Sequence, residues 1–173
     1  MDSWPRGRSA DGGIDEIPLN GIPGRLWLCG KHVVGPDPVA ALARVDATEL
    51  LCFNERHELE ERYPDYVTWL TRSDHDQATW FPTPDLGVRP VEDFVPLVEA
   101  TIERLSSGSR LIAHCGAGIG RTGTFAICTL LHLGHDIDGA SDLVAANRPM
   151  AGPENGAQAE LVQAVARHLR SRS

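Results

Sequence analysis

The sequence contains no long hydrophobic run. No segment of its 173 residues approaches the roughly 18 consecutive apolar residues that a membrane-spanning helix requires. Residues 1–13 are polar and lack the apolar centre of a secretory signal peptide. We therefore expect a soluble, cytoplasmic protein without a membrane partner.

Cysteine is also scarce, and positive charge is outnumbered by negative charge. The four cysteines follow no regular spacing, which in a chain of this length favours free thiols in a reducing compartment over a disulfide scaffold. The formal net charge of −8 argues against a nucleic-acid partner, although it allows a local basic pocket for one anionic group. Lys31 is the only lysine, and because genome composition can produce such a bias, we infer no function from it.

The length and the apolar content of 42% fit a single domain with a substantial core. Residues 1–24 are rich in Gly, Pro, Ser and Asp and show little periodicity, so we expect a flexible N-terminal arm. Residues 25–173 should form the folded domain, without internal repeats or a second domain. We expect this domain to be a monomer.

Short apolar runs alternate with helical patterns along this domain, which predicts an α/β layered fold. The segment 58–70 is ambiguous, because Pro64 interrupts a helical pattern whose aromatic residues would also suit a strand. The remaining pattern predicts strands at 25–29, 47–53, 78–81 and 111–115, and helices at 38–45, 91–105, 122–133, 138–146 and 157–169.

A glycine-rich segment, HCGAGIGRTG at positions 114–123, follows the last predicted strand and leads into a predicted helix. Its glycines, Gly116, Gly118 and Gly120, allow positive φ angles and let successive backbone N–H groups converge on one point. The N-terminus of the next helix adds unpaired N–H groups and the positive end of its dipole. The segment therefore predicts a binding site for a phosphate dianion.

Cys115 and Arg121 stand at the two ends of this loop. The field that binds an anion should also stabilise a thiolate on Cys115, and a thiolate is a strong nucleophile. Arg121 can hold two phosphate oxygens in a bidentate geometry that lysine cannot match. The pair predicts nucleophilic attack by Cys115 on a phosphate held by Arg121.

The segment resembles the His-Cys-(x)5-Arg-Ser/Thr-Gly signature of the cysteine-based protein tyrosine and dual-specificity phosphatases, in particular their compact, dual-specificity-like branch. This resemblance implies a central, mostly parallel sheet of about four or five strands flanked by helices. It also implies a reaction without metal or cofactor, in which Cys115 attacks phosphorus and water hydrolyses the cysteinyl-phosphate.

The resemblance also assigns roles to the residues around the nucleophile. Thr122 would hydrogen-bond the departing thiolate, and the alternative role, which is compatible with the first, is an N-terminal hydroxyl cap of the helix. His114 would order the loop, and the alternative is an ordinary buried histidine. The implied phosphate-binding residues are Gly116, Ala117, Gly118, Ile119, Gly120 and Arg121.

The leaving oxygen needs a proton, and the candidate acids are Asp74, Asp76 and Asp85. Asp85 lies in WFPTPDLGVRP, which resembles the acid loop of the family and precedes Cys115 by 30 residues. Arg89 lengthens the usual Asp-x-Gly-x-Pro pattern by one residue. We expect Asp85 to be the acid, with Asp76 as the alternative, and a turn aspartate without catalytic function as the third reading.

Two further residues match features of related phosphatases. Gln158 resembles a late-loop glutamine that places the hydrolytic water, although an exposed glutamine in the first turn of a helix needs no function. Cys52 lies in LCFNERHEL at 51–59, which resembles a Cys-x-x-Glu-Arg-His region of lipid phosphatases. That resemblance implies a reversible disulfide with Cys115, and the alternative is a small buried apolar cysteine.

The implied substrate is a phosphoprotein. Lysine is absent from positions 116–120, which disfavours a phosphoinositide, while tyrosine-only and dual specificity both stay open. One rival is a catalytically idle phosphate-binding module that acts as a sensor or scaffold. Another is an oxyanion or sulfur-transfer enzyme of the rhodanese or arsenate reductase type, which would not need Thr122 or an upstream acid loop.

Overall fold

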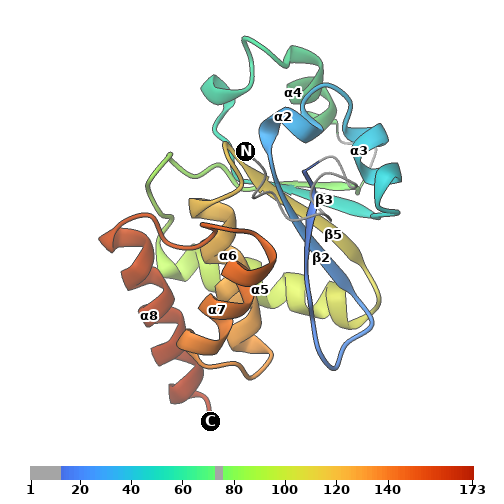
Figure 1. The fold of residues 1–173 in the computed structure, drawn as a ribbon. Helices are drawn as coiled ribbons and strands as arrows, with labels where there is room; N and C mark the ends of the chain where they lie inside the picture. The colour runs from blue at the N-terminus through green and yellow to red at the C-terminus, as the bar shows by residue number, and fades with distance from the viewer. Residues whose placement is uncertain (1–12, 73–75) are drawn as a thin grey trace, which may run out of the picture.

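A five-stranded sheet runs through the centre of the computed structural model, which describes residues 13–72 and 76–173 (Figure 1). The strand order is β1-β2-β5-β3-β4, with β1 antiparallel to β2 and all other neighbours parallel. The predicted α/β class with a mostly parallel sheet is confirmed. The strands are β1 (Asp15–Ile17), β2 (Arg25–Gly30), β3 (Glu49–Cys52), β4 (Ala78–Trp80) and β5 (Arg110–Cys115).

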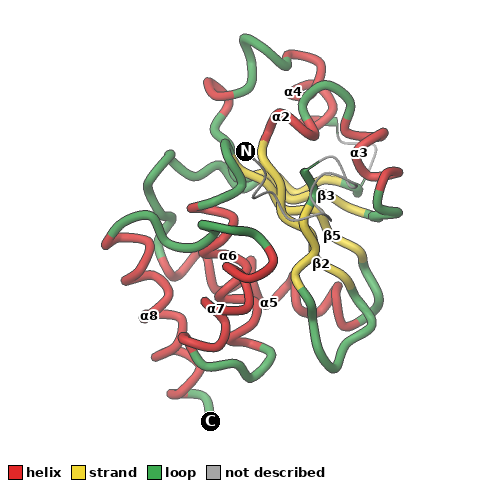
Figure 2. The backbone as a smooth tube through the Cα atoms, viewed as in Figure 1, coloured by secondary structure: helices red, strands yellow, loops and turns green. Residues whose placement is uncertain are grey.

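Helices cover both faces of the sheet (Figure 2). In the described ranges, none of them is long and apolar enough to cross a membrane. One face carries α5 (Val91–Ser106), α6 (Gly120–His132), α7 (Ile137–Asn147) and α8 (Gly156–Ser171). The other face carries α2 (Lys31–Val34), α3 (Pro38–Arg44), the short 3-10 helix η1 (Arg56–Glu58) and α4 (Pro64–Thr71).

The alternation of side chains along the central strand β5 divides the core into two clusters. Leu111, Ala113 and Cys115 belong to the cluster under α5 to α8, whereas Ile112 belongs to the cluster under α2 to α4. Helix α6 is buried from Gly120 to Leu131, as its nearly continuous apolar sequence predicts. The strand and helix that flank the glycine-rich loop are therefore the two most enclosed elements around it.

The N-terminal arm is shorter than predicted. Residues 1–12 lie outside the described residues, but Asp15–Ile17 pair with β2, and Ile14 and Ile17 are fully buried. For this part the prediction of a flexible arm is wrong, because a three-residue edge strand is too short to show a periodic pattern. The ambiguous segment 58–70 resolves into η1 and α4, with Pro64 in the first helical turn, where its missing N–H costs nothing.

Candidate active site

The glycine-rich loop joins the end of β5 to the start of α6 in a tight turn. Gly118 has a φ of +73°, and a Cβ atom there would lie 2.3 Å from the carbonyl oxygen of Cys29. A Cβ atom on Gly123 would lie 2.1 Å from the backbone nitrogen of Gly152. Glycine is therefore required at both positions, by backbone conformation at the first and by close packing at both.

Arg148, which follows α7, fixes the loop from behind. Its Nε donates to the Gly118 carbonyl at 2.7 Å, and its Nη2 donates to the Ala117 carbonyl at 2.9 Å. Its Nη1 forms a buried ion pair with Asp15 of β1 at 2.7 Å. The loop is thus fastened to the sheet edge without a ligand. Sequence reasoning missed both charged residues, since no local pattern links positions so far apart.

Glu58 orients the guanidinium of Arg121. Its Nη1 and Nη2 donate to the two carboxylate oxygens of Glu58, each at 2.8 Å, and Nη1 also donates to the Thr83 carbonyl at 2.8 Å. Only 3% of the Arg121 side chain is exposed. This bidentate pair holds the guanidinium plane beside the loop that carries Cys115.

Glu58 is in turn fixed by the η1 segment. Its carboxylate accepts the backbone N–H of Glu55 at 2.7 Å, in a reciprocal capping arrangement, and the Asn54 amide at 2.9 Å. Burial opposes the charge of Glu58, but the hydrogen bonds and charge of Arg121, helped by these donors, lower its pKa from about 4.5 to about 2. Sequence reasoning missed this residue, although the Glu55 and Glu58 spacing of a capping box was visible.

Of the two candidate acids that lie in the described residues, Asp85 is the one that the structure brings to the site. Its Oδ1 lies 3.4 Å from Nη2 of Arg121, and 71% of its side chain is exposed, which places it at the rim. Asp76 lies shortly before β4 begins. Because β4 is parallel to β3 and β5, Asp76 lies at the end of the sheet where these strands begin, whereas Cys115 lies at the end where they finish. Asp74 lies outside the described residues.

The additional residue in the acid loop, Arg89, anchors that loop. Its guanidinium donates to the Pro82 carbonyl at 3.1 Å and to the Asp93 carboxylate at 3.2 Å. It also stacks over the Phe81 ring at 4.5 Å from the centroid. The insertion therefore leaves Asp85 at the pocket and ties the loop to the start of α5.

His114 is completely buried behind the nucleophile and contacts Tyr66. Its Nε2 lies 2.6 Å from the Tyr66 hydroxyl, and its Nδ1 lies 3.4 Å from the Cys115 carbonyl. Burial lowers the pKa of His114 to about 4, so the ring is neutral at physiological pH. A neutral ring that accepts from Tyr66 and donates toward Cys115 fits the expected ordering of the loop.

Thr122 presents a buried hydroxyl that has no hydrogen-bond partner among the described residues. The N-cap of α6 is Ile119, and no side chain caps the helix. The alternative role of Thr122 as a helix cap is therefore wrong. A buried hydroxyl next to the loop remains free to donate to a thiolate, which is the role that the resemblance implies.

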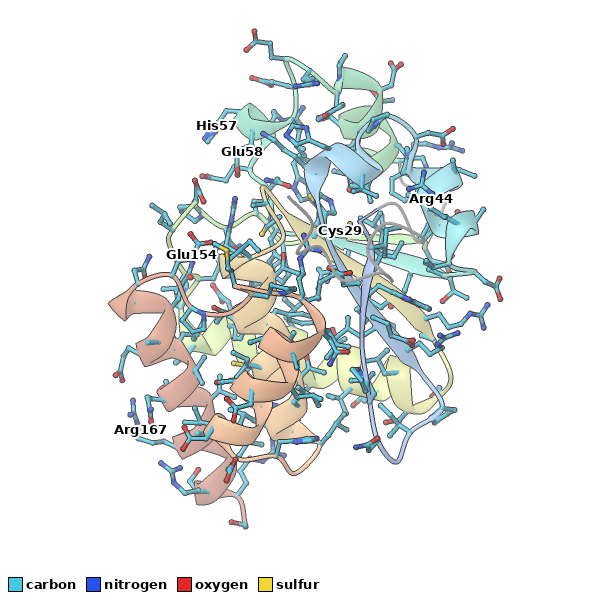
Figure 3. All side chains as sticks on the ribbon, in the orientation of Figure 1. Cys29, Arg44, His57, Glu58, Glu154 and Arg167 are labelled. Carbon is cyan, nitrogen blue, oxygen red and sulfur yellow. The ribbon has the colours of Figure 1, made fainter. Side chains whose placement is uncertain are left out.

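Gln158 is buried, so the alternative interpretation of it as an exposed glutamine in the first turn of a helix is wrong. Its Oε1 accepts the Glu154 N–H at 2.8 Å, and its Nε2 donates to the Gly87 carbonyl at 3.3 Å. A Cβ atom on Gly120 would lie 3.0 Å from its Oε1. Gln158 thus touches the phosphate loop, the acid loop and the segment before α8 (Figure 3 labels Glu154 in that segment).

Cys52 is not brought together with Cys115. Cys52 is paired in register with His114, so its side chain shares the face of His114, and Cys115, the next residue, points to the other face. Burial raises the pKa of the Cys52 thiol to about 12, which makes it a poor resolving thiol. The structure supports the alternative interpretation, a small buried residue of the core.

A known protein family matches most of the chain. The sequence model of a family described as "PTP-SAK: Swiss Army Knife protein, DSP-PTPase phosphatase domain" matches residues 22–173. A search among curated proteins returns no match.

Several solved structures share the fold. A kinase associated phosphatase (KAP), with serine in place of its catalytic-site cysteine, has a TM-score of 0.76 and 20% identity over 91% of this chain and 96% of its own. Tk-PTP in its active form has a TM-score of 0.66 and 22% identity over 88% and 96%. Human DUSP28 has a TM-score of 0.67 and 19% identity over 86% and 95%.

The depressed pKa of Glu58 predicts a loss of stability in acid. Because the folded-state pKa is about 2, below the ordinary value of about 4.5, ionised Glu58 stabilises the fold above about pH 4.5. This stabilisation should disappear as the pH falls toward 2. Urea unfolding of wild type and Glu58→Gln should therefore give a difference in unfolding free energy that shrinks between these pH values.

The matched control is Glu160→Gln, whose ion pair with Arg167 is exposed. It should change the unfolding free energy by less than about 1 kcal/mol at every pH. A difference between wild type and Glu58→Gln that stays constant down to pH 2 would contradict the role of Arg121 as the partner of Glu58.

Proposed function

The chain belongs to the DSP-PTPase phosphatase domain family, and from that premise we propose that it hydrolyses phosphotyrosine in proteins through a cysteinyl-phosphate intermediate on Cys115. The observation that carries the proposal is the position of Arg121. Glu58 holds its guanidinium beside the loop of Cys115, and Asp85 stands 3.4 Å away at the rim. The proposal therefore gives the site a nucleophile, Cys115, a phosphate-binding cation, Arg121, and an acid, Asp85.

In the first step, the phosphate of the substrate enters the loop formed by residues 115–121. Glu58 and Thr83 occupy three N–H donors of Arg121, and the second Nη2–H faces Asp85 at 3.4 Å. Phosphate oxygens would therefore take Nε–H and replace Asp85 at the second Nη2–H. The Cys115 thiolate forms a bond to phosphorus while the ester P–O bond breaks. Asp85 gives its proton to the leaving oxygen.

In the second step, the Asp85 carboxylate takes a proton from water, and the water oxygen bonds to phosphorus as the S–P bond breaks. The hydroxyl of Thr122 donates to the returning thiolate. We assign the orientation of this water to Gln158, whose Nε2 carries a second N–H besides the one given to the Gly87 carbonyl. Neutral His114 keeps the loop ordered throughout.

We extend the proposal to a monomer that acts in the cytoplasm. Phosphoserine and phosphothreonine are the alternative substrates, because the loop sequence is close to that of tyrosine-specific phosphatases while the chain length resembles the dual-specificity branch. The side chains at positions 116–120 carry no positive charge, which supports a phosphoprotein over a phosphoinositide.

Hydrolysis of p-nitrophenyl phosphate in EDTA tests the proposed chemistry. Wild type should hydrolyse this ester with a bell-shaped pH profile, because the reaction needs an ionised thiol and a protonated acid. Cys115→Ser should be inactive at every pH, since serine keeps the shape and loses the thiolate. Activity that survives in Cys115→Ser would contradict the mechanism, and inactivity of both proteins would favour an idle phosphate-binding module.

Asp85→Asn should reduce turnover of an ester with a poor leaving group, such as phenyl phosphate, by roughly 10² to 10⁴. Phosphate binding should change little, because Arg121 and the loop stay intact. Asp76→Asn is the matched control. We expect wild-type turnover from it, since Asp76 lies at the end of the sheet where the strands begin, far from Cys115 at their other end. Turnover lost in Asp76→Asn and kept in Asp85→Asn would reverse the assignment.

A further inference from the structure

A groove of about 540 Å³ opens beside the phosphate loop. Its walls come from the start of α2 on one side and from η1 and the segment before α4 on the other. Figure 3 shows two of its residues, His57 and Glu58, together on one short segment, at the opposite end of the molecule from Arg167. The residues that line it are Lys31, His57, Glu58, Glu61 and Arg62.

The groove is continuous with the phosphate site through Lys31 and Glu58. The backbone N–H of Lys31 donates to the Gly116 carbonyl at 3.0 Å, so α2 begins against the phosphate loop. The Nζ of Lys31 donates to the backbone carbonyl of Glu58 at 3.0 Å. The carboxylate of Glu58 lies 3.9 Å from the position of a Cβ atom on Gly116. An anionic group in the groove would therefore lie within one or two residues of the scissile phosphate.

The charges of the groove favour an anion. The negative charge of Glu58 is balanced by its bidentate pair with Arg121. Among the lining residues, Lys31 and Arg62 then face one unbalanced carboxylate, that of Glu61, while the carboxylate of Glu55 lies 3.9 Å from His57. A locally positive groove stands out in a chain with a formal net charge of −8.

Lys31 is best placed to be the main ligand. Its ammonium group has three donors, and in the described part of the chain the Glu58 carbonyl is the one acceptor recorded for it. That hydrogen bond holds the amine at the groove while the other donors stay available. The side chain is half-buried, so less conformational entropy is lost when it binds a ligand.

We propose that this groove binds a second anionic group, a phosphate or a carboxylate, on the same peptide as the phosphoresidue that the enzyme hydrolyses. The proposal rests on the proposed function and narrows its substrate class to phosphopeptides with a neighbouring acidic or phosphorylated residue. Lys31 and Arg62 attract the second group, and Glu61 limits the attraction.

The test compares phosphotyrosine peptides that differ at a single neighbouring residue, which is serine, aspartate or phosphoserine, placed one or two positions from the phosphotyrosine. The quantity measured is the ratio of kcat/KM for each anionic peptide to that for the serine peptide. Any change in the chemistry itself cancels in this ratio. Wild type should prefer at least one anionic peptide.

Variants should move this ratio in opposite directions. Lys31→Met should lower it by roughly three- to tenfold, the range expected for a partly shielded charge interaction. Lys31→Arg should keep most of the preference, and Glu61→Gln should raise it. The matched control is Arg167→Met, which removes an exposed cation at the other end of the molecule and should leave the ratio unchanged. The preference should weaken as salt is added.

The outcomes separate this inference from the proposed function. If neither p-nitrophenyl phosphate nor any peptide is hydrolysed, the proposed function fails. If the peptides are hydrolysed with equal kcat/KM, or if Lys31→Met and Arg167→Met give the same ratio, the groove is not a subsite. A preference for a soluble phosphoinositide headgroup over every peptide, lost in Lys31→Met, would overturn the assignment to a peptide. A response to phosphoserine but not aspartate would support the proposal with a dianion as the ligand.

Discussion

The side chain of Arg121 is only 3% exposed, so its positive charge must be balanced inside the protein. Glu58 supplies that balancing charge. The pair is bidentate, so it fixes the plane of the guanidinium as well as its position. The same group donates to the Thr83 carbonyl, which ties the acid loop to the phosphate loop. Removing Glu58 would leave an uncompensated buried charge, at a cost on the order of 3–5 kcal/mol.

A second buried arginine, Arg148, fixes the backbone of the phosphate loop, as Glu58 fixes the guanidinium of Arg121. Arg148 donates to the carbonyls of Ala117 and Gly118, and its charge is balanced by Asp15 on β1. The short edge strand is therefore part of the support of the active site. Both arginines are paired within the protein, which holds the loop in one arrangement, so little free energy is spent on ordering it during the reaction.

The sequence predicted the parts of this structure that depend on local patterns. Periodicity located β5, α5, α6 and α8 to within a few residues, and the signature at 114–123 located the nucleophile and its arginine. The pairs that position them were not predictable, because Glu58 lies 63 residues from Arg121, and Asp15 lies 133 residues from Arg148. Such contacts follow from the strand order of the sheet.

The same reason explains the errors in the site. A resemblance to lipid phosphatases implied a disulfide between Cys52 and Cys115, but the register places Cys52 opposite His114 and turns its side chain to the other face. The burial of Gln158 depends on contacts with Gly87 and Gly120, which belong to other elements. The choice of Asp85 over Asp76 was made from the sequence of the acid loop, and the structure adds that Asp85 lies 3.4 Å from Arg121.

Capture of the covalent intermediate tests the central claim most directly. The Thr122→Ala variant, in which the thiolate is a poorer leaving group in the second step, should be mixed with a phosphotyrosine peptide, quenched in acid within one turnover, digested and examined by mass spectrometry. The account predicts one added phosphoryl group on the peptide that contains Cys115, and none when the reaction has run to completion. A phosphoryl group on another residue, or product formed with no phosphorylated Cys115 at any time, would contradict it.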